Sequence, residues 1–201
     1  MRFKIFFITS SLFSIPFIIT FYWLFFLPNI LVENKSLEFY IKKNTSFCDF
    51  FEEIGPHLRS KKSFELASKF KKFNKNLRPG RYIIERTMSN NELINNLRVN
   101  NIPIKLTFNN IERIENLASV ISKQLEVDSL NLINQILNPK FLKDKGFNIN
   151  TALSMYIPNS YEFFWNTSSV NFQKRMYTEY LKFWNTKRLS RAKEINLTPI
   201  Q

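Results

Sequence analysis

The sequence has very little cysteine and histidine, one residue of each in 201: Cys48 and His57. A single cysteine cannot form an intrachain disulfide, and no Cys/His cluster with metal-ligand spacing surrounds either residue. A nucleophilic pair of the Ser–His or Cys–His type would have to use His57, which stands in no motif of that kind. The sequence therefore predicts no metal site and no cofactor, and it argues against this class of nucleophilic catalysis.

Acidic residues are also scarce, with 16 Asp and Glu against 29 Lys and Arg and a net charge of +13 at pH 7. One interpretation is an electrostatic footprint for nucleic acid, anionic lipid or another polyanion. The other is codon bias, because AT-rich codons encode the abundant Lys, Asn, Ile, Phe and Tyr. The basic residues are spread along the chain without a block of like charges, which favours codon bias and excludes a basic tail.

One long stretch lacks charge altogether. Residues 5–27 contain no charged side chain, and about 23 residues suffice for a helix to cross a bilayer core of roughly 30 Å. Arg2 and Lys4 precede the stretch, whereas Glu33 and Lys35 beyond it cancel. The positive-inside bias therefore predicts a single-pass anchor with a cytoplasmic N-terminus and residues 33–201 outside, which argues against a nucleic-acid role.

A cleavable signal peptide is the alternative for the same stretch. Its apolar region would be about 7–15 residues long and would end at a small-residue cleavage site. The run here is longer, and the sequence that follows it, PNILVENKS, has no such pattern. The sequence therefore favours an uncleaved anchor.

The chain is 44% hydrophobic and 22% charged, a composition typical of folded proteins. The residues after the anchor are predicted to form a mixture of short strands and helices. Up to residue 100 they predict a compact α+β module. Its helix at 60–73 has apolar residues near helical spacing at Phe64, Ala67, Phe70 and Phe73. In order, the elements are a strand at 37–43, a helix capped by Thr45 or Ser46 and stopped by Gly55-Pro56, the helix at 60–73, a strand at 77–85, and a helix opened by Ser89 and Glu92.

A second unit begins near residue 102. It is predicted to contain a strand at 102–108, a helix at 114–125, a helix capped by Asp128 or Ser129 and ended by Pro139, a linker at 140–151, and one long or two short helices at 168–195. Near the end of the chain, Thr198 and Pro199 have the pattern of a helix start. That pattern suggests a truncated product or a fragment of a longer protein.

Between the linker and the last helical region lies MYIPNSYEFFWNTS, residues 155–168. This segment holds five aromatic residues, one carboxylate and no Lys or Arg, in a chain otherwise rich in lysine. Two interpretations are open. The segment is buried for packing, or it lines a cleft for a ligand that is neither an acid nor a base.

Several motifs occur in a fixed order behind the anchor. They are Pro79-Gly80-Arg81-Tyr82, then Met88-Ser89 with Glu92, then Pro158-Asn159-Ser160-Tyr161. In that order the sequence resembles the endolytic murein transglycosylases, the MltG or YceG-like family, and especially its Bacteroidetes-type members. The third motif corresponds to the family's Pro-Asp-Thr-Tyr, and the resemblance covers essentially the whole chain.

The resemblance implies an α+β architecture in three parts: a cytoplasmic tip, transmembrane anchor and linker at 1–35, a LysM-like module at 36–100, and the first part of a YceG-like catalytic domain at 101–201. It also implies cleavage of MurNAc–GlcNAc bonds in nascent peptidoglycan strands at the bacterial inner membrane. The periplasmic part would then contact glycan strands and, as further candidate partners, cell-wall synthesis enzymes. The family's reaction leaves 1,6-anhydroMurNAc ends and needs only one carboxylic acid, because the sugar's own 6-hydroxyl attacks instead of water. Ordinary glycosidases use a pair of carboxylates.

The sequence departs from the family pattern at the residues that matter for this chemistry. Asn159 replaces the motif's Asp and cannot titrate, and Ala152-Leu153-Ser154 stands where members have Leu-Glu-Gly. The family's catalytic Glu would lie beyond Gln201, so no catalytic residue is assigned. Glu162 is the nearest substitute and is disfavoured, because the acid needs a defined place over the scissile oxygen and a raised pKa.

On this resemblance, the predicted substrate-binding residues are Tyr156, Asn159 and Tyr161. Aromatic rings stack on sugar faces, while hydroxyls and amides bind the rim. The packing alternative stays open for both tyrosines, and Phe163, Phe164 and Trp165 are interpreted as core. Three functions remain in view: a membrane-bound lytic transglycosylase, a non-catalytic murein-binding or scaffold remnant, and a protein that binds an anionic polymer or lipid head groups.

Overall fold

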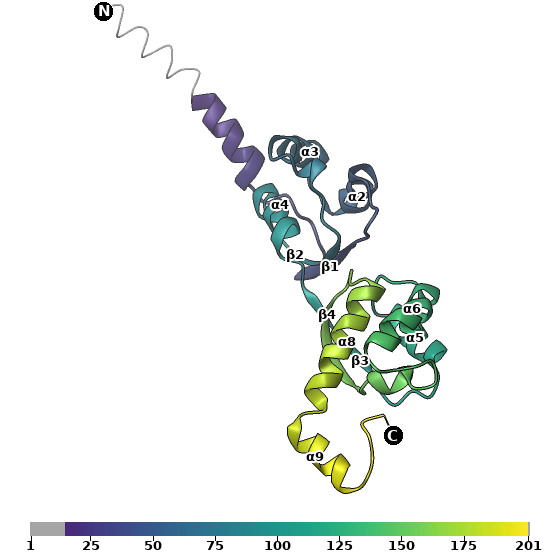
Figure 1. Ribbon diagram of the computed structural model, residues 1–201. Helices are drawn as coiled ribbons and strands as arrows, with labels where there is room; N and C mark the ends of the chain where they lie inside the picture. The colour runs from purple at the N-terminus through teal and green to yellow at the C-terminus, as the bar shows by residue number, and fades with distance from the viewer. Residues whose placement is uncertain (1–14, 201) are drawn as a thin grey trace, which may run out of the picture. The chain divides into compact units, whose positions relative to one another are not determined.

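The computed structural model of the protein describes residues 15–200 (Figure 1). The chain divides into two compact units, with the boundary between Ile102 and Pro103. Both units combine helices with a two-stranded antiparallel sheet, so the predicted α+β class is confirmed. Each unit has its own core of buried apolar side chains.

The predicted membrane anchor, residues 5–27, lies in part outside the described residues. Residues 15–26 form a helix, here called the N-terminal helix, and its exposed side chains include Tyr22 and Trp23. Within residues 15–200, no helix combines the length and the apolar character needed to cross a membrane.

Both strands predicted for the first unit are confirmed. β1 (Ser36–Ile41) pairs with β2 (Gly80–Glu85) in an antiparallel register that places Phe39 opposite Tyr82. Alternate side chains of a strand point to opposite faces, so one face of this sheet meets the core. The buried side chains on that face are Phe39, Ile41, Tyr82 and Ile84.

Serine side chains start the helices of the first unit. Each serine accepts a hydrogen bond from the backbone N–H three residues further on, which satisfies one free donor at the helix start. The carboxylates of Asp49 and Glu92 accept hydrogen bonds from the backbone N–H of the first and the last of these serines, which completes two capping boxes. The predicted cap at Ser89 is confirmed, and of Thr45 and Ser46 the second forms the cap. The helices are α2 (Phe47–Ile54) after Ser46, α3 (Lys61–Phe70) after Ser60, and α4 (Asn90–Val99) after Ser89.

The α-helix α2 ends at Ile54 with Gly55 as its C-cap, so the predicted stop at Gly55-Pro56 is confirmed. One turn of 3-10 helix, η1 (Gly55–His57), follows it directly. Proline is compatible with the first turn of a helix, because the N–H that it lacks would have no partner there. The chain becomes extended only at Leu58.

The helix predicted at 60–73 ends early, and its predicted apolar stripe is only partly correct. Phe70 is 68% exposed, whereas Phe73 is fully buried. The reason is the backbone of Lys72, which is left-handed (φ 54°) and breaks the helix between the two phenylalanines. The chain resumes as η2 (Phe73–Lys75), which turns Phe73 into the core.

A buried network of amide side chains holds the end of the N-terminal helix against the first unit. Asn90 Nδ2 donates to the Leu24 carbonyl (2.7 Å) and to Ser63 Oγ (2.6 Å). Asn29 Nδ2 donates to Asn90 Oδ1 (2.7 Å), and Asn29 Oδ1 accepts from the Ser60 N–H (2.8 Å). Because buried polar groups are costly when unpaired, this network fixes where the N-terminal helix leaves the unit.

The second unit is built on a sheet of two strands, of which the sequence predicted one. β3 (Pro103–Phe108) pairs antiparallel with β4 (Asn159–Phe164), and the register places Phe108 opposite Asn159. The sequence analysis assigned no strand to the aromatic segment 155–168. β4 therefore corrects the prediction for that segment.

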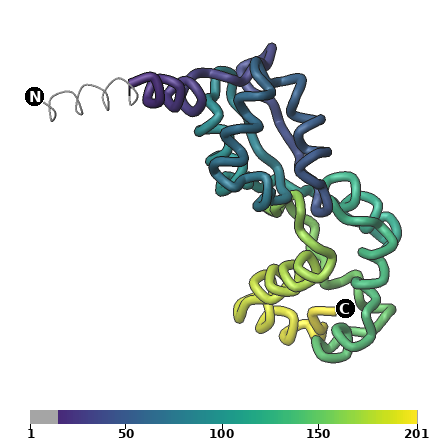
Figure 2. Tube along the Cα trace, turned by 90° about the horizontal axis from the view of Figure 1, so that it is seen from above, coloured from purple at the N-terminus to yellow at the C-terminus, as the bar shows by residue number. Residues whose placement is uncertain are grey.

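Helices cover one face of this sheet and complete the second core. The longest of them, α8, is the yellow-green helix in Figure 1 and Figure 2. The region predicted as one long or two short helices forms two. The helical elements are α5 (Ile114–Ser122), α6 (Ser129–Ile136), α7 (Pro139–Asp144), η3 (Ala152–Met155), α8 (Ser169–Phe183) and α9 (Thr186–Glu194).

The linker predicted at 140–151 is wrong in its first part, where α7 lies. Pro139 does not simply end the preceding helix. It occupies the first turn of α7, and Asn138 caps that helix by accepting the Phe141 N–H at 3.0 Å. Proline is favoured at this position because its ring presets the helical backbone angle. Leu142 is thereby carried into the core.

The aromatic segment divides between packing and exposure. Phe163 is buried, as expected of a core residue, and its ring lies 5.3 Å from that of Phe172 on α8. Phe164 is 50% exposed, which contradicts its assignment to the core. Neighbouring residues of a strand face opposite sides of the sheet, so Phe163 and Phe164 cannot both point inward. Trp165, just after the strand, is partly buried.

Candidate functional site

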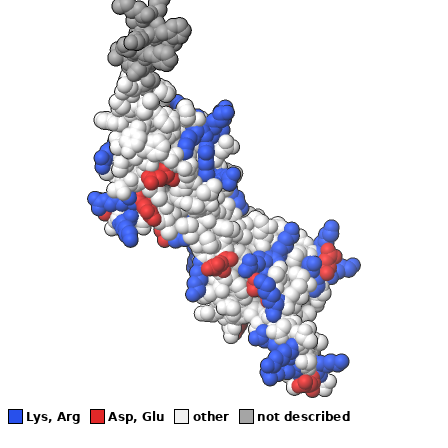
Figure 3. Space-filling model, turned by 90° about the vertical axis from the view of Figure 1, so that its left-hand side faces the viewer, with Lys and Arg blue, Asp and Glu red and all other residues white. Residues whose placement is uncertain are grey.

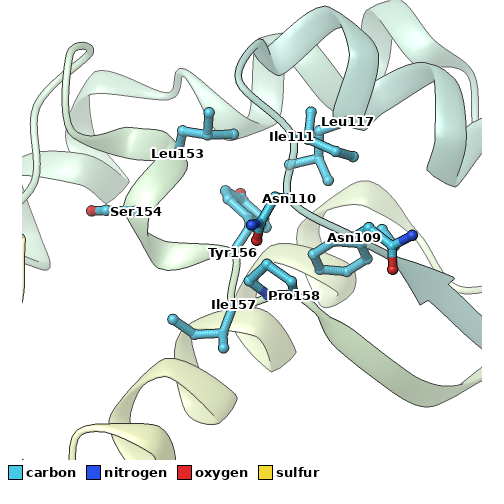
Figure 4. A pocket seen from close by; sticks show the side chains of 10 residues that line it. Asn109, Asn110, Ile111, Leu117, Leu153, Ser154, Tyr156, Ile157 and Pro158 are labelled. Carbon is cyan, nitrogen blue, oxygen red and sulfur yellow. The ribbon is translucent and has the colours of Figure 1, made fainter.

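The second unit contains a cleft of about 320 Å³ at one end of its sheet. Figure 4 shows its side chains coming from the segment after β3 and the segment before β4, with Leu117 from α5. Within residues 15–200, the side chains that line the cleft include no Lys, Arg, Asp, Glu or His. The lining residues are Phe108, Asn109, Asn110, Ile111, Leu117, Leu153, Ser154, Tyr156, Ile157 and Pro158.

The sheet register explains why these two segments meet. β3 ends at Phe108 and β4 begins at Asn159, and these two residues are partners in the antiparallel ladder. The residues that follow β3 and those that precede β4 therefore leave the sheet at the same end. The cleft lies between them.

Buried anchors hold the second of these segments. Ala152 and Met155 of η3 are fully buried, so the turn between them is fixed to the core. Ser154 Oγ donates to the Thr151 carbonyl at 2.7 Å. Leu153 and Ser154 thus reach the cleft from a rigid turn rather than from a free loop.

Tyr156 is the one predicted site residue that lines the cleft. It is 5% exposed, and its ring stacks on Phe172 at 6.0 Å. Within residues 15–200 its buried hydroxyl makes no hydrogen bond of normal geometry. Burial raises the pKa of Tyr156 well above its usual value, and the Gln173 amide, which donates to the Ile136 carbonyl, offsets only part of this effect. Tyr156 therefore stays neutral and can donate a hydrogen bond but cannot act as a base.

Tyr161 does not line the cleft and supports it from behind. It is 8% exposed, its hydroxyl donates to the Ile157 carbonyl at 2.5 Å, and its ring stacks on Phe108 at 5.7 Å. Both of these partners line the cleft. Burial, and to a smaller extent the charge of Glu179, raises the pKa of Tyr161. Its geometry is that of a packing residue that positions the cleft wall.

Asn159 is exposed and also lies outside the cleft lining. Its Oδ1 accepts a hydrogen bond from the Ser160 N–H at 2.8 Å, which fixes the start of β4. Ser160 Oγ in turn shares a hydrogen bond of 2.7 Å with Thr107 Oγ1 across the sheet. The structure thus brings Tyr156 to the cleft, Tyr161 behind it and Asn159 to its edge.

The sequence analysis missed the opposite wall of the cleft. Asn109 and Asn110 follow β3 directly and are exposed, and Ile111 continues the lining. The sequence signal that could have identified them is the end of the alternating strand pattern at Phe108, which two amide side chains follow directly. Without the strand partner of β3, nothing in the sequence placed this pair beside Tyr156.

Glu162 lies elsewhere. It sits on β4 opposite Lys105 and lines a separate hollow of about 400 Å³ together with Pro103 and Arg175. Among residues 15–200, no group of three or more His, Cys, Asp and Glu side chains is placed to hold a metal ion. The cleft therefore offers neutral donors, neutral acceptors and apolar surface, a combination suited to a ligand rich in hydroxyl or amide groups.

The earlier sequence motifs have structural roles in the first unit. The Arg81 guanidinium forms an ion pair with Glu38 (2.6 Å), and the hydroxyl of the buried Tyr82 donates to the Arg78 carbonyl (2.9 Å). Ser89 and Glu92 form the capping box of α4. These motif residues stabilise local structure and leave the cleft of the second unit as the candidate site.

Comparison with known proteins gives a family and similar solved structures. A family model described as the YceG-like family matches residues 39–201. The crystal structure of a protein described as YceG-like, from Listeria monocytogenes, is similar at 14% identity and a TM-score of 0.45. The match covers 82% of this chain and 60% of that one, so the chain spans about 60% of that protein's length. The search of curated proteins gave no match.

Proposed function

Because the chain belongs to the YceG-like family, whose model covers residues 39–201, we propose that it is a membrane-anchored endolytic murein transglycosylase. The proposed reaction cleaves MurNAc–GlcNAc bonds within nascent peptidoglycan strands and leaves 1,6-anhydroMurNAc ends, which terminates strand elongation. In this reaction the 6-hydroxyl oxygen of the sugar bonds to C1 as the glycosidic C1–O bond breaks. A single carboxylic acid protonates the leaving oxygen, and the resulting carboxylate accepts the proton of the 6-hydroxyl.

The observation that carries the proposal is the uncharged cleft in a chain of net charge +13. A glycan presents hydroxyls, amides and flat apolar faces. The amides of Asn109 and Asn110 and the Tyr156 hydroxyl would bind hydroxyls and N-acetyl groups, while Ile111 and Leu153 would contact the sugar faces. The lining offers no charge that could pair with a charged ligand.

Residues 15–200 would hold the strand but not supply the acid. No carboxylate is among the side chains that line the cleft, and Glu162 lies at a different hollow. A general acid must come within hydrogen-bond reach of the glycosidic oxygen, either directly or through one water. We therefore expect no lytic activity from the 201-residue chain by itself.

The acid-free lining also favours a second candidate, a non-catalytic murein-binding or scaffold protein. The two candidates share the same glycan cleft and differ only in whether a carboxylate is added to it. Release of 1,6-anhydroMurNAc ends by a longer protein that contains this chain would select the enzyme.

The remaining parts of the proposal concern the first unit and the membrane. Residues 5–27 would anchor the protein in the bacterial inner membrane, with residues 33–201 in the periplasm beside cell-wall synthesis enzymes. The exposed Tyr22 and Trp23 rings suit a membrane interface. The strand–helix–helix–strand order of β1, α2, α3 and β2 supports a LysM-like module at 36–100.

The proposal is tested by binding of murein glycan strands to the full chain in a non-ionic detergent. Asn110→Trp places a large side chain at the exposed rim of the cleft and should weaken binding at least about tenfold by blocking it. Asn150→Trp is the matched control, because Asn150 is also exposed and lies outside the lining. It should bind like the unaltered chain.

A salt series separates this binding from simple charge attraction. Binding in an uncharged cleft should change little between low and high salt, whereas charge-driven binding should fall steeply. Equal binding by both variants, or loss of all binding at high salt, would contradict the proposed site.

A further inference from the structure

The first unit contains a strongly basic hollow of about 610 Å³ that the proposed function does not use. Five of its seven lining residues carry a positive charge, and none carries a negative charge. It lies between the end of α3 and the start of β2, with one contribution from the last turn of α4. The lining residues, here called the cationic pocket, are Lys71, Lys72, Lys75, Asn76, Leu77, Arg78 and Arg98.

The loop that carries most of these residues is fixed by its neighbours. Phe73 is fully buried in the core, and the hydroxyl of the buried Tyr82 donates to the Arg78 carbonyl at 2.9 Å. Asn76 Nδ2 donates to the carbonyl of Lys72, whose left-handed backbone forms the turn. Lys72 directly follows the C-cap of α3, where a left-handed residue is a common way for a helix to end.

Neutral groups position two of the cations without cancelling their charge. Lys71 Nζ donates to Asn91 Oδ1 and, at 2.9 Å, to Asn95 Oδ1. An Arg98 guanidinium nitrogen donates to the Lys71 carbonyl. Within residues 15–200, none of the five cations of the pocket forms an ion pair. Burial and, secondly, the charge of Arg98 lower the pKa of Lys71, as expected where like charges are held together.

Such a grouping costs stability in the free protein, since like charges repel and partial burial reduces screening. On the face shown in Figure 3, Lys and Arg side chains form several groups, and Asp or Glu side chains lie beside some of them. The sequence suggested that the basic residues are dispersed, but the fold gathers five of them around one hollow.

We propose that the cationic pocket binds a ligand that carries a diphosphate group. Two guanidinium groups can each donate a pair of hydrogen bonds to phosphate oxygens, and three ammonium groups add point charges. Five cations match the two to four negative charges of a diphosphate better than the single charge of a carboxylate. The proposal concerns the first unit alone and does not depend on the glycan cleft.

A diphosphate could be free in solution or attached to a lipid, and the chemistry of recognition is the same. The experiment therefore has two arms on the full chain in non-ionic detergent micelles. One arm titrates inorganic pyrophosphate, and the other titrates micelles doped with farnesyl diphosphate. Binding is followed by calorimetry at several salt concentrations.

The informative variant is Lys72→Gln/Lys75→Gln/Arg78→Gln, which removes three charges from the pocket. It should weaken binding of pyrophosphate at least about tenfold. The control Lys187→Gln/Arg191→Gln/Lys193→Gln removes the same charge from exposed positions on α9 and should change binding less than about twofold. A second variant, Lys72→Arg/Lys75→Arg/Arg78→Lys, keeps the charge and should bind normally, which would show that the Gln variant loses binding through its lost charge and not through substitution of the loop as such.

Tight binding in either arm supports the pocket, and the tighter arm identifies the source of the diphosphate. Three results would overturn the proposal: no saturable binding of either probe, equal weakening by the pocket and α9 variants, or displacement of pyrophosphate by a Glu-rich peptide at lower concentration. The last result would assign the pocket to an acidic protein partner instead.

Discussion

At the scale of single residues, Tyr156 and Tyr161 separate two roles that the sequence left open. The Tyr156 hydroxyl is buried beside the cleft without a hydrogen bond of normal geometry among the described residues, whereas the Tyr161 hydroxyl donates to Ile157. An unpaired buried hydroxyl is retained at a cost, and a ligand can satisfy it. Tyr156 is therefore the side chain expected to contact a glycan, and Tyr161 is expected to hold the wall.

Removing the two hydroxyls one at a time should affect stability and glycan binding in opposite ways. Tyr161→Phe leaves the Ile157 carbonyl unpaired and should lower the free energy of unfolding by about 1 kcal/mol, with glycan binding unchanged. Tyr156→Phe removes an unpaired group, so stability should stay the same or rise while glycan binding falls. Chemical denaturation and a binding titration on both variants give the comparison. If Tyr156→Phe is destabilised and binds normally, the assignment is reversed.

Gly80 shows that the Pro-Gly-Arg-Tyr motif is a packing motif. A Cβ at this position would lie 2.5 Å from Asn101 Cγ, and the backbone angle (φ 156°) is unfavourable for other residues. Asn101 cannot simply move, because its Oδ1 accepts the Arg81 N–H at 3.0 Å. We expect Gly80→Ala to cost about 1–3 kcal/mol.

Gly55→Ala is the control for this substitution. Its Cβ would meet only the end of the flexible Lys61 side chain, at 2.9 Å, in a helical backbone. Its effect on thermal unfolding should be small. Similar destabilisation by the two substitutions would show that Gly80 is not specially constrained.

The ion pair between Glu38 and Arg81 predicts a pH dependence of stability. The hydrogen bond from Arg81, more than its charge, lowers the pKa of Glu38 below the usual 4.5. A lowered pKa in the folded state stabilises above pH 4.5, and this contribution is lost as pH falls through the folded-state pKa. Because the Glu38 side chain is 54% exposed, solvent screening limits the effect to at most about 1 kcal/mol.

Glu38→Gln isolates this contribution. The difference in unfolding free energy between the unaltered chain and Glu38→Gln should be constant from about pH 6 to 8 and should disappear toward pH 3. Urea titrations across this range measure it. A difference that grows as the pH falls would mean that the carboxylate is not stabilised in the folded protein.

At the scale of elements, the capped helices and the patterned strands were predictable, and the partner of β3 was not. Ser89 with Glu92 and the alternation at 102–108 are local signals, and each gave the correct element. β4 follows a proline and has apolar residues on both faces, so it lacks a clean alternation. Its identity depends on pairing with a strand about 50 residues earlier, which no local pattern contains.

The same limit applies to the candidate site. Tyr156 was predictable from the composition of its own segment, but Asn109 and Asn110 become site residues only because β3 and β4 end together. The break at Lys72 was likewise not predictable, because lysine has no preference for a left-handed backbone. The exposed Phe70 follows from that break.

The attachment of the N-terminal helix can be tested through Asn90. Asn90→Ala would leave the Leu24 carbonyl, Ser63 Oγ and the Asn29 amide without their buried partner. We expect a loss of about 2–4 kcal/mol and faster hydrogen exchange at the Asn29 and Ile30 amides, which bond to the Met88 carbonyl. Unchanged exchange at these two amides would show that the network does not hold the helix.

At the scale of the whole molecule, the two units differ in the charge that lines their hollows. The net charge of +13 includes a cluster of five cations around the pocket of the first unit, while the cleft of the second unit carries no charge at all. Neutral glycan and anionic ligand would thus bind at different sites and respond differently to salt. The net charge of the sequence alone does not reveal that the two hollows differ in this way.

A crystal structure of the full chain with a murein tetrasaccharide bound would decide whether the uncharged cleft holds the glycan. We expect sugar rings between residues 108–111 and 153–158, with the Tyr156 hydroxyl donating to the sugar. No carboxylate of residues 15–200 should lie within hydrogen-bond distance of a glycosidic oxygen. A sugar bound elsewhere, or Glu162 poised on that oxygen, would contradict this interpretation.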